Sequence, residues 1–550
     1  MRSLKSIKLY FFSILKLSLL SFRNYYLSSS FYNKKLISFI PDRFFYSPSA
    51  HLCASLITAS NDFYKITNQS TNLFWETDIK DIQKFENLHS FLWLTKIDKK
   101  NISKVVQSII INWINKYYDY DPRSWNVNTT SKRIIAWSSN LDITLNEANE
   151  EYRNKFFLSI VKQSNFLLKN IKNLPLDSSR IACCSAIILS GLIFKENFLN
   201  LKYGLRTLEK IVSNYFDKHG FPRSRNPEEV FQSIKYLILI REWLKESQQS
   251  IPEFLNDIIL KCGKCYNFLS TTQKYFPLFN GSSEFSHKKY DIFLKTLKYN
   301  FNSNEDEIGE IFKLKHKKIE LFFDAGNPPS NNYLNYYQAG CLAFELISKG
   351  EKIICNSGYG KYLNSRFSSV SRSTAAHSTL YINNTSSSLF QNNKTIKKVY
   401  GNSLIHKHKI LEKKLTKDES NYYLSATHNG YEKKYGYLHK RIIKFSKEEN
   451  KIYGTDELHQ TKNIAGSINY FIRFHIYPGI KIVKTKEGNS VLISTANGGG
   501  WLLKTLENNL NIERNVFLAR KKIINNECVF INGSSKDSKI TIKWQIEKIK

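Results

Sequence analysis

The sequence has little cysteine, a single methionine and few acidic residues, and it contains no long uninterrupted apolar run. Eight cysteines among 550 residues, without the spacing of a disulfide framework, exclude a scaffold held together by disulfides. No segment reaches the roughly 20 consecutive apolar residues that a membrane-spanning helix requires. The fold is therefore expected to depend on hydrophobic cores.

Cys262 and Cys265 form a Cys-x-x-Cys pair. No second pair and no neighbouring histidine cluster completes a zinc site around them. From the residues we predict neither a bound metal nor a cofactor.

Apolar residues make up 42% of the chain and aromatic residues 14%, enough for large cores in two or three domains. The net charge is +34, from 81 Lys and Arg against 47 Asp and Glu. Such a charge attracts polyanions, namely nucleic acid, an anionic membrane face or an acidic polysaccharide. A codon bias towards Lys, Asn and Ile is an alternative source of the charge. Because no helix-turn-helix, zinc-finger or RNP signature is present, we predict no specific nucleic-acid partner.

Residues 1–39 form a basic and apolar N-terminal segment. Arg2, Lys5 and Lys8 precede an apolar stretch, as in a signal peptide. Lys16 interrupts that stretch, however, and no small-residue cleavage site follows it. We predict an amphipathic helix that contacts a membrane surface peripherally.

From Asp81 onward, apolar residues recur at spacings of three and four, the period of an amphipathic helix. Ser131 is a cap signal for one of these helices. Short connections predict antiparallel helical hairpins, arranged as an α-solenoid or a closed α/α toroid. The predicted helices cover residues 85–94, 105–118, 131–140, 152–171, 178–194, 203–216, 228–246 and 251–269.

The composition changes after about Phe276, where polar and turn-forming residues end the helical pattern. From Lys313 to Lys550, short alternating runs are separated by regularly spaced turns, which predicts an antiparallel β-sandwich. The predicted fold class is thus an α+β multidomain chain. Its parts are an α/α toroid at 40–285, a linker at 286–312 and a β-sandwich at 313–550.

The stretch from Asp324 to Leu380 stands out within the predicted sandwich. Two apolar runs, 341–346 and 352–356, flank a turn at 348–350 and predict a hairpin. Loops on a stable sheet are common places for functional side chains. The loops here carry Tyr336, Tyr337, Gln338, Arg372 and His377.

This stretch also has a distinctive order: Asp-x-Gly, Pro-Pro, Ala-Gly-x-Leu-x-Phe-Glu-Leu, Asn-x-Gly and Arg-x-Thr-Ala-Ala-His-x-Thr-Leu. The positions are Asp324, Gly326, Pro328, Pro329, Ala339, Gly340, Leu342, Phe344, Glu345, Leu346, Asn356, Gly358, Arg372, Thr374, Ala375, Ala376, His377, Thr379 and Leu380. The order resembles the bacterial heparinase II/III-like proteins, whose better-known members are polysaccharide lyases. The resemblance extends over most of the chain from about Ile40 and implies a toroid followed by a sandwich.

The resemblance implies cleavage of uronic-acid glycosides by β-elimination. That reaction needs a group that neutralises the uronate carboxylate, a base for the C5 proton and an acid for the leaving oxygen. A cleft between toroid and sandwich would collect these groups, and an anionic polysaccharide would be the partner.

The chain departs from the family at the positions that carry this chemistry. The family's His-x-His loop, with one catalytic and one zinc-binding histidine, aligns with Tyr336 and Gln338. A further zinc position falls near Asn356, which leaves His377 alone. Because a Gln, Asn and His set is a poor zinc site, we predict no zinc. The family's toroid tyrosine aligns with Glu229, and its uronate-gripping Asn-His pair falls near residues 178–180.

The candidate residues from this comparison each have a structural alternative. His377 could be a hydrogen-bonded structural histidine, and Arg225 could pair with Glu228 or Glu229. The two neighbouring tyrosines could pack instead of stacking on sugars, and His219 precedes a glycine in an exposed turn. The predicted catalytic residues are His377, Tyr336 and Arg225, and the predicted substrate-binding residues are Gln338, Tyr337, His219, Arg372 and Asn226.

Two functions remain as hypotheses. The first is a polysaccharide lyase with a divergent active site. The second is a non-catalytic or divergent relative that binds or helps to assemble an acidic envelope glycan. We expect a periplasmic or cell-envelope location, with the cytoplasm as the alternative because the signal peptide is poor.

Overall fold

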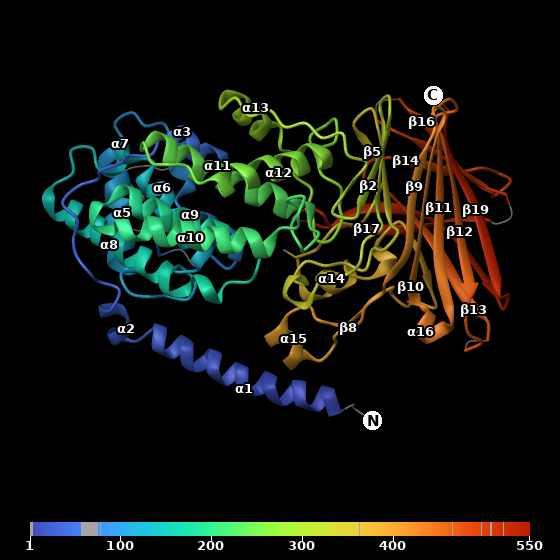
Figure 1. Ribbon diagram of the computed structural model, residues 1–550, viewed down its shortest axis with the longest axis horizontal. Coiled ribbons are helices and arrows are strands. Elements are labelled where there is room, and N and C mark those ends of the chain that lie inside the picture. The colour runs from blue at the N-terminus through green and yellow to red at the C-terminus, as the bar shows by residue number, and fades with distance from the viewer. Residues whose placement is uncertain are drawn as a thin grey trace. The chain divides into compact units, whose positions relative to one another are not determined.

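The computed structural model describes residues 4–56, 75–76, 79–361, 363–464, 466–496, 498–506, 509–520 and 522–549 (Figure 1). Residues 57–74, 77 and 78 of the predicted toroid segment lie outside this description. The chain forms two compact units. We call residues 1–216 with 231–262 the helical unit, and residues 217–230 with 263–550 the sheet unit.

The helical unit is built from helices joined by short connections. Its helices are α1 (Leu4–Leu27), α2 (Ser30–Lys34), α3 (Ala50–Cys53), α4 (Ile82–His89), α5 (Ser103–Lys116), α6 (Val127–Ser138), α7 (Leu141–Thr144), α8 (Glu150–Asn170), α9 (Ser178–Ile193), α10 (Phe198–Tyr215), most of α11 (Pro227–Glu246) and the first part of α12 (Glu253–Leu269). Each helix that the apolar period predicted is present with small shifts of its ends, except that residues 92–96 form a 3-10 turn after α4.

Helix α6 begins earlier than the sequence predicted. Its N-cap is Asn126, whose side-chain oxygen accepts from the backbone N–H groups of Asn128 and Thr129. The predicted cap, Ser131, lies one turn inside the helix and donates its hydroxyl to Val127 O at 2.7 Å. The cap prediction was wrong because asparagine also caps strongly, and Asn126 stands five residues earlier.

A buried arginine organises the core of the helical unit. Arg133 donates Nη1 to the carbonyl oxygens of His89 and Ser124, and Nε to Gln163 Oε1. Its guanidinium also lies 4.0 Å from the ring centre of Trp113. This side chain therefore ties α4, α6 and α8 together while its charge stays surrounded by acceptors and an aromatic face.

The sheet unit contains two large antiparallel sheets. One has the order β1-β2-β3-β4-β5-β13-β18-β17, with β6 also paired to β13, and the other has the order β14-β15-β16-β19-β12-β11-β10-β9. The strands are β1 (Glu307–Ile308), β2 (Ile311–His316), β3 (Ile319–Asp324), β4 (Phe344–Ser348), β5 (Glu351–Cys355), β6 (Leu380–Ile382), β9 (Ile410–Lys417), β10 (Asn421–Tyr431), β11 (Tyr437–Ser446), β12 (Lys451–Gln460), β13 (Ile468–Ile476), β14 (Lys481–Lys484), β15 (Ser490–Ser494), β16 (Gly500–Thr505), β17 (Leu510–Phe517), β18 (Ile524–Ser535) and β19 (Lys539–Lys548). Smaller elements are α13 (Lys288–Thr296), α14 (Ser365–Val370), α15 (Lys394–Tyr400), α16 (Glu432–Tyr435) and a pair formed by β7 (Leu389–Phe390) and β8 (Leu404–His406).

Aromatic side chains join the two sheets. Phe344 of β4 stacks on Trp544 of β19 with ring centres 5.5 Å apart, and Phe474 of β13 meets the same indole edge-on. Along β12 buried and half-buried residues alternate, because one face of the strand points into this core. The predicted antiparallel sandwich and its hairpin, β4 with β5, are both present.

The limits of the units differ from the predicted domain limits. Residues 217–230 and 263–285 belong to the sheet unit, although both lie within the predicted toroid segment at 40–285. Arg225 explains part of this difference, because its side chain is buried against the loops that follow β1 and β3.

Candidate functional site

Gln338 fixes the loop between β3 and β4 from inside the sheet unit. The side chain is buried, and its Nε2 donates to the carbonyl oxygens of Gly358 and Ser371 at 3.1 and 2.6 Å. Its Oε1 accepts from the backbone N–H of Gly281 at 2.8 Å. The three contacts are to separate backbone segments, so this amide cross-links them and holds the loop in one conformation.

Arg372 holds the same loop from its other side. Its Nε donates to Tyr337 O at 2.8 Å and its Nη2 donates to Leu334 O at 3.2 Å. The guanidinium packs 4.1 Å from the ring centre of Phe390, and burial lowers the pKa of Arg372 to about 10. The side chain is 3% exposed, so its donors serve the protein backbone.

His377 lies beneath the loop and is 1% exposed. Its Nδ1 donates to Ser373 O at 2.8 Å, which leaves Nε2 as the nitrogen with a lone pair, and that atom is buried without a hydrogen-bond partner. The ring packs so closely on Gly340 that a Cβ there would lie 2.6 Å from Cδ2. Burial lowers the pKa of His377 to about 4, so the imidazole is neutral near pH 7.

The two neighbouring tyrosines differ in exposure. Tyr337 is buried, its hydroxyl has no hydrogen-bond partner, and burial raises its pKa. Tyr336 is half-buried, and its ring meets that of Tyr359 edge-on with centres 6.4 Å apart. The ammonium nitrogen of Lys361, also half-buried, lies 4.9 Å from the Tyr336 ring centre. A phenol and a cation therefore stand together at the partly open end of the loop.

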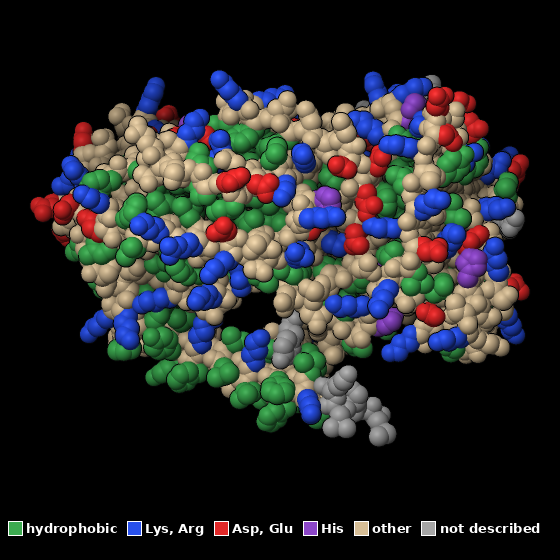
Figure 2. Space-filling model, viewed as in Figure 1, with side chains coloured by type: hydrophobic (Ala, Val, Ile, Leu, Met, Phe, Trp, Pro, Cys, Tyr) green, Lys and Arg blue, Asp and Glu red, His purple; other side chains and the backbone are tan. Residues whose placement is uncertain are grey.

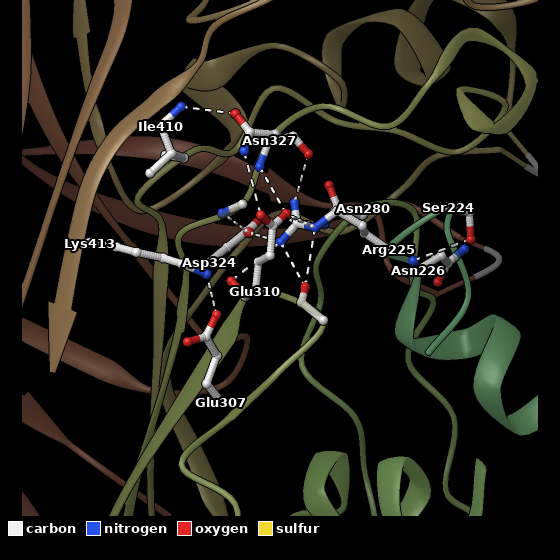
Figure 3. A network of polar contacts seen from close by, with 12 residues as sticks. Ser224, Arg225, Asn226, Asn280, Glu307, Glu310, Asp324, Asn327, Ile410 and Lys413 are labelled. Atoms are coloured by element: carbon white, nitrogen blue, oxygen red, sulfur yellow. Dashed lines mark hydrogen bonds and ion pairs between the residues drawn. The ribbon is translucent and has the colours of Figure 1, made fainter. Parts of the chain in front are cut away.

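Arg225 is buried within a set of carboxylates and carbonyl oxygens (Figure 3). Its Nη2 contacts Asp324 Oδ1 at 2.5 Å, and its Nε lies 3.2 Å from Glu310 Oε2. Burial opposes the charge, but these carboxylates outweigh burial and raise the pKa of Arg225 above its ordinary value. Arg225 thus forms ion pairs within the protein, as its structural alternative proposed, but its partners are Asp324 and Glu310 and not the neighbouring Glu228 and Glu229.

Gly326 makes this insertion of Arg225 possible. A Cβ on Gly326 would lie 1.9 Å from the Arg225 Cζ atom, so the guanidinium lies directly on the glycine backbone. The Asp324 carboxylate also receives the Gly326 N–H at 3.2 Å and the Asn280 side-chain amide at 3.3 Å. Asp324 and Gly326 of the Asp-x-Gly order thus form the site that binds the Arg225 guanidinium.

Asn226 and His219 lie outside the loop cluster. Asn226 is buried, and its side-chain oxygen accepts from the backbone N–H of Glu228 at 2.9 Å, at the start of α11. His219 is exposed in a turn, where its carbonyl oxygen accepts from the Cys265 thiol. The structure therefore gathers Tyr336, Tyr337, Gln338, Arg372 and His377 around one loop, whereas the Arg225 side chain is held by Asp324 and Glu310. The predicted functional roles of all eight residues stay predictions.

A chain of buried histidines runs through the sandwich. The backbone N–H of Gly430 donates to His428 Nδ1, so His428 Nε2 carries the proton and donates to His439 Nδ1 at 3.1 Å. His439 Nε2 then donates to Asp456 Oδ1 at 2.7 Å. Burial lowers the pKa values of both histidines. His428 and His439 meet because they are direct cross-strand partners in β10 and β11.

The residues at the family's zinc positions do not fit a zinc ion. The Gln338 amide is fully used by backbone partners. Asn356 accepts from Ser378 N and donates to Glu345 Oε1. Among the described residues, no group of three or more His, Cys, Asp or Glu side chains could hold a metal ion. Of Gln338, Asn356 and His377, only His377 has a buried side-chain atom without a hydrogen-bond partner, its Nε2, and one such donor does not make a zinc site.

Lys361 was missed by the sequence analysis. It lies in the segment Gly358 to Lys361, after the Asn-x-Gly motif, where a single lysine in a lysine-rich chain attracts no attention. A signal was nevertheless present, because a basic residue beside a glycine-rich turn on a site loop is a candidate for binding carboxylates. Lys361 and Tyr336 thus bring an ammonium and a phenol side by side.

Comparison with known proteins agrees with this architecture. The family described as "Heparinase II/III-like, C-terminal" matches residues 306–545. No curated protein sequence matches the chain significantly.

Solved structures share the fold over most of the chain. A crystal structure of heparinase III has a TM-score of 0.69 at 14% identity, over 90% of this chain and 83% of that one. A second heparinase III gives 0.66 at 16% identity, over 89% and 82%. The heparan sulfate lyase HepC from Pedobacter heparinus gives 0.61 at 14% identity, over 91% and 82%. The predicted α/α toroid followed by a β-sandwich is confirmed, and residues 306–545 match the C-terminal domain of the heparinase II/III-like family.

Proposed function

We propose that this protein cleaves an acidic polysaccharide by β-elimination, and that Tyr336 and Lys361 are the residues that meet the uronate. The observation that carries the proposal is the pairing of a half-buried phenol on the loop between β3 and β4 with a half-buried ammonium on the loop that follows β5, both in the matched domain. Neighbours in fold are named heparinase III and heparan sulfate lyase, which supports an anionic polysaccharide as the substrate class.

The two side chains suit the steps of the reaction. The Lys361 ammonium pairs with the uronate carboxylate and so makes the C5 proton more acidic. The Tyr336 phenolate oxygen takes that proton while the C4–O4 bond breaks and the C4–C5 double bond forms. The same phenol then returns the proton to the leaving oxygen, so the enzyme ends in its starting state. His377 and Arg372 serve in this scheme as positioning residues, because both hold the loop from beneath.

The test is the ultraviolet absorbance of the unsaturated product on a panel of polyuronates, including alginate and heparan-type chains. Tyr336→Phe and Lys361→Gln should each lower the rate by about a hundredfold or more. Tyr423 and Lys444 form a matched control pair, with the ammonium 5.8 Å from the phenol ring of an exposed tyrosine. Tyr423→Phe and Lys444→Gln should leave the rate unchanged. Full activity in Tyr336→Phe would overturn the assignment.

Binding without cleavage is the second candidate function. Its support is that Gln338, Arg372 and Arg225 direct their polar atoms to internal partners, so few groups remain for catalysis. Under this candidate the wild-type chain retains acidic polysaccharide on an affinity gel and releases no unsaturated product. Loss of retention in Lys361→Gln would then place the binding surface at the same loop.

We further propose a periplasmic or cell-envelope location, where a substrate of this class is accessible. The proposal is supported by the apolar and basic character of residues 1–39. Fractionation of cells that express the full chain tests it, and recovery of the protein only in the cytoplasmic fraction would contradict it.

A further inference from the structure

Helix α1 (Leu4–Leu27) presents large apolar side chains to solvent along its length. Phe11 is 67% exposed, Phe22 is 71% exposed and Tyr25 is 79% exposed. Figure 2 shows green apolar side chains gathered over this helix, interrupted by lysine and arginine. Single exposed apolar residues are common on soluble proteins, whereas a contiguous run of them marks an interaction surface.

Most of the exposed apolar side chains face away from the side of α1 that the protein covers, and Leu20, which is 38% exposed, is an exception. Ser13 and Leu27 are buried and mark the covered side. With 3.6 residues per turn, Phe11, Leu15 and Phe22 lie within about 40° of one another and roughly opposite Ser13. A helix packed on a core turns its apolar face inward, whereas the apolar face of α1 points outward.

The charge around α1 has one sign. The first acidic residue of the chain is Asp42. The residues before it include the basic side chains of Arg2, Lys5, Lys8, Lys16, Arg23, Lys34 and Lys35. Lys16 and Arg23 lie on the same edge of the helix, within about 20° of one another and about 100° to 120° from the middle of the outward face. An apolar face bordered by cations is complementary to an anionic lipid surface, where each basic residue contributes about 1 kcal/mol.

The attachment of α1 orients it as a surface element. Arg23 Nη2 donates to Asn170 Oδ1 at 2.7 Å, which joins the C-terminal end of α1 to the end of α8. Along the described chain, no helix combines the length and apolarity that crossing a membrane requires. A helix of this composition, held at one end and carrying lysines along its length, is suited to lie in the plane of an interface.

We propose that α1 docks the protein on an anionic lipid bilayer, with the outward face of Phe11, Leu15 and Phe22 in the boundary between headgroups and acyl chains. Lys16 and Arg23 contact the anionic headgroups beside that face. This proposal is independent of the proposed cleavage of polysaccharide, since α1 and the Tyr336 loop belong to different units.

The test is co-sedimentation of the full-length chain with vesicles of phosphatidylcholine containing 30% phosphatidylglycerol, compared with pure phosphatidylcholine vesicles. The wild-type chain should bind the anionic vesicles, and the triple variant Phe11→Ser, Leu15→Ser, Phe22→Ser should bind them at least about tenfold more weakly. Leu199→Ser, at a side chain 74% exposed on α10, is the matched control and should bind like the wild type.

A second measurement separates docking from adhesion by net charge. A tryptophan in the Phe22→Trp variant should shift its emission to the blue when anionic vesicles are added, and the shift should persist at 0.5 M salt in part. Equal binding by the triple variant would overturn the proposal and assign the adhesion to net charge. The proposal would also be overturned if the lipid-free chain self-associates and the triple variant does not. The outward face of α1 would then bind a second copy of α1.

Discussion

Arg441 and Asp456 form a buried two-point ion pair across strands β11 and β12, with Nε to Oδ1 at 2.8 Å and Nη2 to Oδ2 at 3.0 Å. The remaining guanidinium nitrogen donates to Leu342 O and Ser378 O at 2.8 and 2.9 Å. Those carbonyl groups belong to the segments that carry Gln338 and His377. The ion pair of Arg441 and Asp456 in one sheet thus holds the segments that follow β3 and β5 of the other sheet.

Asp456→Asn should lower the free energy of unfolding by about 3–5 kcal/mol, because it leaves the Arg441 charge buried without a carboxylate. Urea unfolding, followed by the β-sheet circular dichroism signal, measures the loss. Glu547→Gln removes the partner of Lys451 in a more exposed pair and should cost about 1 kcal/mol or less. Equal losses in the two variants would show that the buried pair contributes no more to the free energy of unfolding than the more exposed pair.

The stability of the sheet unit should fall as the pH falls from about 6.5 to 4. Burial lowers the pKa values of His377 and His408 to about 4, so both bind protons more readily when unfolded. A group with a lowered folded pKa stabilises the fold above its unfolded pKa and loses that contribution on acidification. Each of these histidines can contribute about 3 kcal/mol to the loss.

Urea midpoints at pH 7.5, 6.5, 5.5 and 4.5 measure this dependence. His408 donates Nε2 to Gly326 O and accepts from Ser388 Oγ at Nδ1, so it can be replaced by an amide of similar shape. His408→Gln should flatten the pH dependence relative to the wild type. A flat wild-type profile over this pH range would contradict the prediction.

The sequence predicted the elements well and their contacts poorly, for a physical reason. Helical periods and alternating strands are local, so α8 and the hairpin of β4 and β5 were found close to their observed limits. The pairing of Arg225 with Asp324 joins residues 99 positions apart, and no local pattern encodes it. The three backbone partners of Gln338 likewise come from three distant segments, so no local pattern shows these contacts.

Gly326→Ala should destabilise the sheet unit by about 2 kcal/mol or more, since the added Cβ would overlap the Arg225 guanidinium. Gly466→Ala is the matched control, because nothing lies within 4 Å of a Cβ at that position. It should change the free energy of unfolding by no more than about 0.5 kcal/mol. Thermal unfolding of both variants checks the prediction, which fails if Gly326→Ala unfolds at the wild-type temperature.

Gln338→Glu should destabilise the protein near pH 7 and recover part of the loss in mild acid. At pH 7 an ionised carboxylate would face Gly358 O and Ser371 O, which now accept hydrogen bonds from the amide. Two carbonyl oxygens disfavour that charge, so the folded pKa of the new glutamate lies above its unfolded value. The variant therefore approaches the wild type as the pH falls and the carboxyl group regains a proton to donate.

Gln338→Met removes the same hydrogen bonds without a titrating group, so the stability that it loses should not vary with pH. The measurement is the difference in urea midpoint between each variant and the wild type from pH 7.5 to 5. A constant difference for Gln338→Glu would mean that the amide donors are not what holds the loop.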